Sequence, residues 1–241
     1  MTDRLARIAG IGSYLPDRIL SNDDLAAMVD TSDSWIRERT GIRQRHIAPD
    51  GVTTADLAEQ ACRRALDDAG LTADDVDLIV VATTTPDFTF PSVGTMLQAR
   101  LGATKGAAFD VQAVCTGFVY AISVADNMIA RGQAETALVV GAETMSRILD
   151  WTDRSTCVLF GDGAGAMVLT AGEAAGTDGA DGILATYLRS DGRFKDLLHV
   201  DGGPSSTGTV GHLRMVGNQV FRHAVTNIAE SMTTIAGRAG V

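Results

Sequence analysis

The sequence predicts an α/β protein whose central sheet is covered by helices on both faces. Two runs, 78–85 and 137–143, are apolar almost throughout, which is typical of strands that are buried on both sides. A third run, 109–118, combines a short apolar strand with a sharp turn and the start of a helix. Helical segments separate these strands, and this alternation favours helix layers around one sheet.

Composition narrows the class of protein. The chain has 241 residues, 45% of them hydrophobic and 21% charged, which is enough for a large core. Its three cysteines lack metal-type spacing, so we expect neither a disulfide framework nor a metal site. The formal net charge of −10 argues against nucleic-acid binding. The chain shows no signal-peptide pattern and no membrane-length apolar run, so we expect a cytoplasmic protein.

Cap residues and apolar periodicity predict the elements of the first part of the chain. In order, we expect a strand at 7–15, a short helix through Met28 capped at Ser21, a mostly loop-like segment at 30–46 with a helical turn around Trp35, a helix from Thr53 or Thr54 to Gly70, the strand at 78–85, and a helix from Ser92 to Gly102.

The second part continues the alternation and then changes character. We expect a strand ending at Cys115, an apolar helix at 116–131 that is buried all round, the strand at 137–143, and a glycine-rich turn at 160–165 into a strand. A new unit should start after about Gly172. It would hold a strand at 183–189, a polar loop at 190–211, and an amphipathic helix at 217–236 with its apolar face inward.

Cys115 stands at the turn before the helix at 116–131. Unsatisfied N–H groups and the helix dipole favour a thiolate at a helix start, and the same groups can receive an oxyanion. This placement favours a nucleophile, with a small core cysteine as the alternative. Cys62 is expected in the core, and Cys157 is expected to be structural.

Four arginines form a basic island beside Trp35 in this acidic chain: Arg37, Arg39, Arg43 and Arg45. The island is either a solvated, salt-bridged surface or a site for phosphate or an acidic partner. Trp35 favours the second interpretation, because an indole with arginines suits a nucleotide base near phosphates.

Five stretches of the sequence are more specific indicators of function than the amino-acid composition. They are DTSDSWI at 30–36 with RTGI at 39–42, the Cys115 turn, DRST at 153–156, FGDGAG at 160–165 and GNQVF at 217–221. In this order they resemble the β-ketoacyl-acyl carrier protein synthase III family of the thiolase superfamily. The resemblance covers the whole chain and implies a five-layered αβαβα fold of two similar halves, usually as a homodimer. It predicts two domains, 1–172 with the nucleophile and 173–241 as the start of an incomplete second half.

The resemblance implies a role for each matching residue. Cys115 would be the acylated nucleophile, and Trp35 and Arg154 would sandwich the adenine of coenzyme A. The remaining expected positions are Thr31, Arg39 and Phe221 along the coenzyme A tunnel, Thr84, Met145 and Phe160 in the acyl pocket, and Phe90 reaching across the dimer to close that pocket. For Thr84, Met145 and Phe160, ordinary core packing is the alternative.

The sequence also departs from the family. The resemblance implies a histidine and an asparagine in later His-Gln-Ala-Asn and Gly-Asn-Thr motifs, and neither motif occurs in the 241 residues. The histidines present are His46, His199, His212 and His223, and none has that context. We therefore expect the gene product or a natural partner to include a further C-terminal portion.

The implied reaction is a decarboxylative Claisen condensation that starts fatty acid synthesis. Cys115 would take an acyl group, most often acetyl, from acyl-coenzyme A, and malonyl-acyl carrier protein would be the second substrate, with no permanently bound cofactor. The alternatives are a related starter-unit or ketone synthase, and a non-catalytic carrier-binding subunit. The outward-facing arginines of the basic island could also steer the acidic carrier protein.

Overall fold

The structure is a computed structural model that describes residues 4–173 and 182–241. The chain divides into two compact units. The first unit holds the described parts of Met1–Leu15, Asp50–Glu143 and Gly163–Leu188, and the second holds Pro16–Pro49, Thr144–Asp162 and Arg189–Val241. These units interleave along the chain. The predicted division after residue 172 concerns the two thiolase-like halves and stays a prediction.

A five-stranded sheet in the order β1-β7-β6-β4-β5 forms the centre of the first unit. Its strands are β1 (Arg4–Tyr14), β4 (Leu78–Ala82), β5 (Ala107–Val111), β6 (Thr136–Thr144) and β7 (Asp162–Glu173). β4 runs parallel to β5 and β6, whereas β1 pairs antiparallel with β7. The three parallel strands therefore end at the same edge of the sheet.

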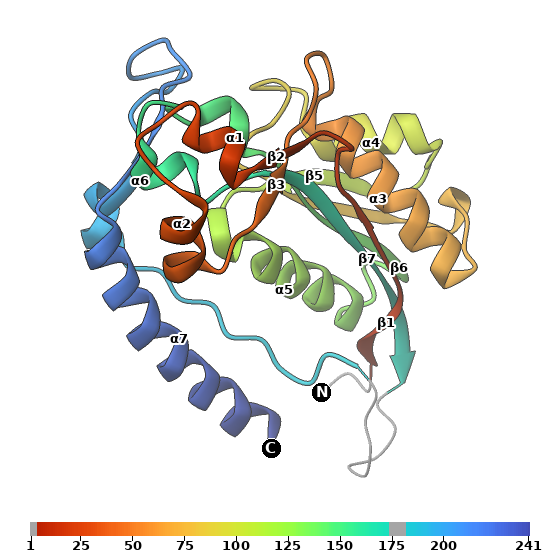
Figure 1. The fold of residues 1–241 in the computed structure, drawn as a ribbon. Helices are drawn as coiled ribbons and strands as arrows, with labels where there is room; N and C mark the ends of the chain where they lie inside the picture. The colour runs from red at the N-terminus through yellow and green to blue at the C-terminus, as the bar shows by residue number, and fades with distance from the viewer. Residues whose placement is uncertain (1–3, 174–181) are drawn as a thin grey trace. The chain divides into compact units, whose positions relative to one another are not determined.

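Helices cover both faces of this sheet, as the sequence predicts. α5 (Gly117–Ala130) lies on one face, and α3 (Thr54–Ala69) and α4 (Val93–Leu101) lie on the other (Figure 1). α3 approaches β1 closely because β1 carries glycines: a Cβ on Gly10 would lie 2.5 Å from Ala69 N, and one on Gly12 would lie 2.3 Å from Ala61 O. Any side chain at these positions would push the helix away.

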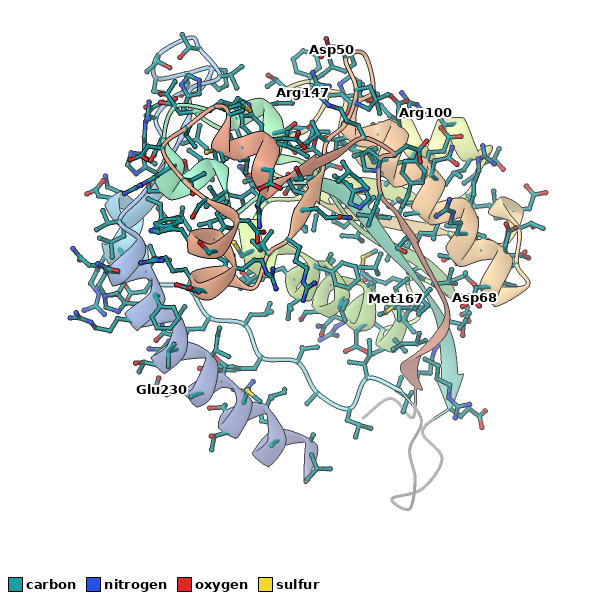
Figure 2. The ribbon with its side chains drawn as sticks, viewed as in Figure 1. Asp50, Asp68, Arg100, Arg147, Met167 and Glu230 are labelled. Carbon is teal, nitrogen blue, oxygen red and sulfur yellow. The ribbon has the colours of Figure 1, made fainter. Side chains whose placement is uncertain are left out.

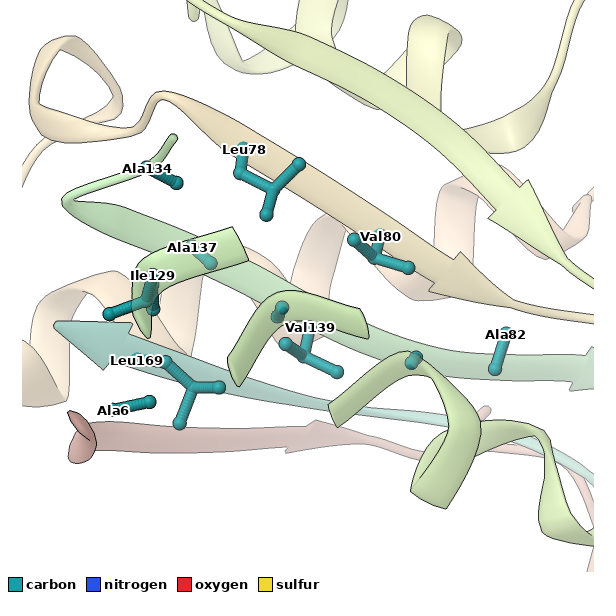
Figure 3. Packing of buried hydrophobic residues seen from close by; sticks show 11 residues of the cluster. Ala6, Leu78, Val80, Ala82, Ile129, Ala134, Ala137, Val139 and Leu169 are labelled. Atoms are coloured by element: carbon teal, nitrogen blue, oxygen red, sulfur yellow. The ribbon is translucent and has the colours of Figure 1, made fainter. Parts of the chain in front are cut away.

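The core between α5 and the sheet is made of alternating residues (Figure 3). Leu78 and Val80 of β4 point toward α5, because side chains two apart on a strand share a face. Ala121 and Ile129 of α5 are fully buried there, but Val119 is 47% exposed. The expectation that this helix is buried all round is therefore wrong for the described residues, because only one of its faces packs on the sheet.

The second unit combines short elements and one long helix with two small hydrophobic clusters. They are β2 (Ile19–Ser21) paired with β3 (Gln44–His46), β8 (Leu198–Val200) paired with β9 (Leu213–Met215), and the helices α1 (Asn22–Ala26), α2 (Asp33–Thr40), α6 (Arg154–Cys157) and α7 (Gly217–Ala239). The expected helix caps are all present: Ser21 caps α1 in the second unit, and Thr53 and Ser92 cap α3 and α4 in the first unit.

α2 corrects the expectation of a mostly loop-like segment. It is an eight-residue helix, and the Ser32 side chain accepts a hydrogen bond from Trp35 N at 3.1 Å. Gly41 ends it in the left-handed conformation, with φ of +73°. Both cap residues are visible in the sequence, but dense charge and weak periodicity hid the helix between them.

Two further expectations differ from the structure. Residues 183–189 are irregular rather than a strand, although Ile183 N donates to Ala6 O at 2.9 Å. α7 is present, but four of the residues expected to face inward are exposed, among them Phe221 at 71% and Met232 at 65%, whereas Val220, Ala224 and Ile235 are half-buried. Within the second unit α7 is held at Glu230, which bonds Arg189 at 2.7 Å (Figure 2). No helix among the described residues is long and apolar enough to cross a membrane.

Candidate active site

Cys115 lies on a strained turn between β5 and α5. One turn of 3₁₀ helix (Val114–Thr116) joins the two elements, and Val114 has a φ of +50°. A β-branched residue rarely adopts this conformation, and such outliers gather at functional sites. The Cys115 side chain is exposed, whereas Cys62 and Cys157 are buried. Only one of the three thiols is therefore presented to solvent in the part of the chain that the structure describes.

The ends of β4 and β6 support this turn from below. A Cβ on Gly117 would lie 3.1 Å from Ala82 Cβ, so the start of α5 rests on the end of β4. On β6, a Cβ on Gly141 would lie 3.2 Å from the ring of Phe118. The first turn of α5 is thus fixed by two neighbouring strands, and Cys115 is held directly in front of it.

The start of α5 has no side-chain cap. The Thr116 hydroxyl donates to Ala113 O at 2.9 Å instead of accepting from the helix. The first N–H groups of a helix have no partner within the helix, and they carry the positive end of the helix dipole. At the start of α5, Thr116 N donates to Ala113 O at 3.2 Å and Gly117 N donates to Val114 O, so the feature beside Cys115 that favours negative charge is the positive end of the helix dipole.

A threonine turn follows β4 at the same edge of the sheet. Thr84 N donates to Glu143 Oε1 at 2.8 Å, and the Thr84 hydroxyl accepts from Gln112 Nε2 at 3.0 Å. Burial raises the pKa of Glu143, against the hydrogen bonds that lower it. The predicted acyl-pocket residue Thr84 is therefore tied to the segment that leads to Cys115. Phe90, in the loop beyond, is 83% exposed.

In the second unit, two arginines lie against the ring of Trp35. Arg39 Cζ is 4.5 Å from the ring centroid and Arg154 Cζ is 5.0 Å away. Arg39 is one helical turn beyond Trp35 on α2, whereas Arg154 starts α6 and donates to Asp30 O at 2.6 Å. The fold thus brings Arg154 to Trp35 and Arg39 from a distant stretch of the sequence, so three predicted coenzyme A residues meet.

Thr31 and Phe221 lie in the same unit. Thr31 Oγ1 is buried and has no hydrogen-bond partner among the described residues. Buried hydroxyls normally find a partner, so Thr31 Oγ1 is an exception to that rule, and its oxygen is closed to solvent. Phe221 stands in the first turn of α7 and is largely exposed.

Met145 and Phe160 belong to one hydrophobic cluster of the second unit. The adjoining backbone is held by Asp162, which is 4% exposed. Its carboxylate accepts from Ser146 N at 2.8 Å, from Ser146 Oγ at 2.6 Å and from Ala48 N at 2.7 Å. Arg147, labelled in Figure 2, donates to Pro49 O at 2.8 Å. We did not single out Asp162 from the sequence, although it lies in the FGDGAG stretch.

The structure corrects the expectation for Arg45, one of the four arginines of the basic island. Its side chain is 5% exposed and donates to Asn22 Oδ1 at 2.9 Å and to Val158 O at 2.8 Å. Burial lowers the pKa of its guanidinium. Arg45 therefore ties β3 to its surroundings and cannot steer a partner, whereas Arg37, Arg39 and Arg43 are exposed.

Among residues 4–173 and 182–241, no three His, Cys, Asp or Glu side chains gather in a way that could hold a metal ion. The groups suited to a ligand are instead the Trp35 stack, which fits an aromatic base with phosphates, and the helix start beside Cys115.

Comparison with known proteins agrees with this geometry. Residues 109–192 match the family model of 3-oxoacyl-[acyl-carrier-protein (ACP)] synthase III. The chain is 68% identical over 223 residues to a β-ketoacyl-[acyl-carrier-protein] synthase III of Rhodospirillum centenum, covering 92% of this chain and 68% of the relative. The corresponding protein of Caulobacter vibrioides is 62% identical over 234 residues, covering 97% and 73%. A crystal structure of the Pseudomonas aeruginosa synthase III has a TM-score of 0.90 at 46% identity, covering 98% and 71%.

A cysteine on a strained strand-to-helix turn, within an α/β fold of the thiolase type, defines the class of condensing acyltransferases. The predicted thiolase-like fold class is thereby confirmed. The chain belongs to the β-ketoacyl-[acyl-carrier-protein] synthase III family, the acyltransferases that initiate fatty acid synthesis.

Proposed function

We propose that Cys115 takes an acyl group from acyl-coenzyme A and passes it to the carbanion of a malonyl group on acyl carrier protein. The observation that carries this proposal is the exposed thiol on a strained turn at the uncapped start of α5. The relatives named as synthases of this kind support both substrates at the level of the family.

In the first step the Cys115 thiolate attacks the carbonyl carbon of the acyl thioester. The carbonyl oxygen becomes an oxyanion, which the positive end of the α5 dipole stabilises. When the tetrahedral species collapses, the bond to the coenzyme A sulfur breaks, and coenzyme A leaves as a thiolate that takes up a proton. One thioester replaces another, so little energy separates reactants from products.

The coenzyme A would lie against the second unit. Its adenine enters between Trp35 and Arg154, because an indole ring and a planar guanidinium both stack on an aromatic base. Arg39 serves the phosphates, the free Thr31 hydroxyl meets a polar group of the coenzyme, and Phe221 lines the tunnel. The acyl chain would contact Thr84, Met145 and Phe160, with Phe90 closing the pocket from a second copy in a homodimer.

In the second step malonyl-carrier protein loses carbon dioxide, and the resulting carbanion attacks the acyl group on Cys115. A carbon–carbon bond forms, the Cys115 sulfur leaves as a thiolate, and the β-ketoacyl carrier protein departs. The resemblance assigns this step to histidine and asparagine motifs that do not occur in these 241 residues. The roles proposed for residues of this chain therefore concern the first step and the acyl-enzyme.

The proposal is tested by following radiolabelled acetyl-coenzyme A with malonyl-carrier protein, using this chain joined to the portion of a synthase III relative that carries the histidine and asparagine motifs, with and without Cys115→Ala. We expect the variant to keep its fold and lose condensation. Condensation by the variant at the wild-type rate would remove the nucleophile. Turnover supported only by a different second substrate would favour a related starter-unit synthase.

A further inference from the structure

Glu143, at the carboxyl end of β6, accepts hydrogen bonds from three successive residues of the turn after β4. Thr84 N donates to Oε1 at 2.8 Å, Thr83 Oγ1 lies 3.5 Å from Oε2, and the Thr85 hydroxyl donates to Oε2. An ionised carboxylate has only acceptors to offer, so a turn that presents three donors matches it. Glu143 and the threonines all belong to the first unit.

The far side of the same turn is also fixed. The Thr54 hydroxyl, at the start of α3, donates to Thr85 O at 2.6 Å, and Thr85 N donates to Thr83 Oγ1 at 3.2 Å. Thr85 is therefore held both by α3 and by Thr83 of its own turn. Among the described residues, Glu143 is the only one whose side chain accepts a hydrogen bond from Thr84 N.

Thr84 connects this carboxylate to the nucleophile turn. Its hydroxyl accepts from Gln112 Nε2, and the neighbouring Thr83 N donates to Val111 O at 3.3 Å. Gln112 and Val111 are the last residues before the segment in which Val114 takes its strained φ and Cys115 follows. The path from Glu143 to the cysteine turn thus runs through two hydrogen bonds, Glu143–Thr84 and Thr84–Gln112.

We infer that Glu143 is a positioning residue for acyl transfer, which holds Thr84 against Gln112 and so fixes the turn that carries Cys115. The inference rests on the proposed function of Cys115. Glu143 acts through other residues, because its oxygens are occupied by the threonine donors. A strained turn keeps its geometry only when its surroundings over-determine it, and Glu143 supplies one of these constraints.

The test compares Glu143→Gln with Asp77→Asn as a matched control. Asp77 accepts hydrogen bonds from Glu135 N at 2.9 Å and from Thr136 N at 3.0 Å. These donors lie at the start of β6, whereas Glu143 lies at its carboxyl end. The side chains of Asp77 and Glu143 are both half-buried. Each substitution replaces a carboxylate by an amide of similar shape, which turns one acceptor into a donor. Both variants should lose similar thermal stability, so a difference in chemistry belongs to the site.

Two rates are measured for each variant: acylation of Cys115 by acetyl-coenzyme A, and alkylation of Cys115 by iodoacetamide. We expect Glu143→Gln to lower the maximal acylation rate about ten- to a hundredfold, since small displacements of a reacting group have effects of that order. The KM for acetyl-coenzyme A should stay within about twofold, and Asp77→Asn should match the wild type in both rates.

Thr85→Val provides the second variant if Glu143→Gln does not fold. It removes one hydroxyl donor to Glu143 at nearly constant shape, and it should lower the acylation rate in the same direction by less. The inference would be overturned if Glu143→Gln were acylated as fast as Asp77→Asn. The same holds for Thr85→Val where it serves as the test variant. Alkylation by iodoacetamide separates the two proposals. If acetyl-coenzyme A did not acylate the wild type at all, the proposed function would fail. An altered alkylation rate in Glu143→Gln would still support a role of Glu143 in positioning Cys115.

Discussion

Arg154 lies over the ring of Trp35, with its guanidinium carbon 5.0 Å from the ring centroid. The contact joins the start of α6 to α2, and the Asp30 carbonyl holds the arginine in place. Arg39 approaches the same ring at 4.5 Å. An indole with two planar cations over its ring is suited to an aromatic base that carries phosphates.

The first prediction concerns Trp35→Ala. We expect the KM for acyl-coenzyme A to rise about tenfold or more, because cation–π and stacking contacts of about 1 kcal/mol each are lost. Stability should fall by less than the ~3–5 kcal/mol typical of a fully buried ring, since Trp35 is half-exposed. Steady-state kinetics and denaturant unfolding measure the two effects. The control is Trp151→Ala, which removes the other tryptophan, and an unchanged KM in Trp35→Ala would contradict the binding role.

The second prediction concerns Asp162→Asn. An amide cannot accept from both Ser146 and Ala48 as the carboxylate does, so one buried donor loses its partner. We expect a loss of about 1–3 kcal/mol in the free energy of unfolding. The control is Asp24→Asn, because Asp24 accepts from Ser21 N and Ser21 Oγ at the exposed surface. Equal losses of unfolding free energy in the two variants would show that the burial of Asp162 does not make its hydrogen bonds more stabilising.

The third prediction concerns the three thiols. Burial raises the pKa of Cys62 to about 12, and it also raises the pKa of the buried Cys157. At neutral pH a thiol with a pKa three units higher than usual holds about a thousandfold less thiolate. We therefore expect a thiol reagent to label Cys115 quickly, and the other two only after unfolding. Fast labelling of Cys62 or Cys157 in the folded protein, seen by peptide mapping, would contradict this account.

The fourth prediction concerns the carrier protein. Arg43 is exposed beside α2, so Arg43→Glu, made in the chain joined to the portion with the histidine and asparagine motifs, should slow the reaction with the acidic carrier substrate more than the reaction with acyl-coenzyme A. The difference should shrink as salt rises, because exposed charges are screened within about 10 Å at 0.1 M. Arg131→Glu, at the end of α5 opposite Cys115, changes net charge equally. Equal effects of the two reversals, independent of salt, would leave Arg43 without a steering role.

Local signals predicted much of the fold. The caps at Thr53 and Gly70 bound α3, and the apolar run from Leu78 gave β4. Expectations went wrong where long-range contacts decide. The turn after Ala82 leaves the sheet because Glu143 binds it, and Arg45 is buried because three polar acceptors from distant segments meet its guanidinium.

The candidate site was predictable in a similar, partial way. A motif identified Cys115 and the residues of the Trp35 stack, because each lies in a specific stretch of sequence. Glu143 and Asp162 are carboxylates in apolar or glycine-rich surroundings, and their donors come from segments far along the chain. Nothing in the local sequence states which donors a carboxylate will meet, so their positions required the structure.

The central claim is that Cys115 forms the acyl-enzyme, and peptide mass spectrometry after brief incubation with acetyl-coenzyme A tests it most directly. Our account predicts one acetyl group, on the peptide that contains Cys115, and its loss in Cys115→Ala. Acetylation at Cys62 or Cys157 instead, or an unmodified Cys115 in a folded protein that binds acetyl-coenzyme A, would contradict the account.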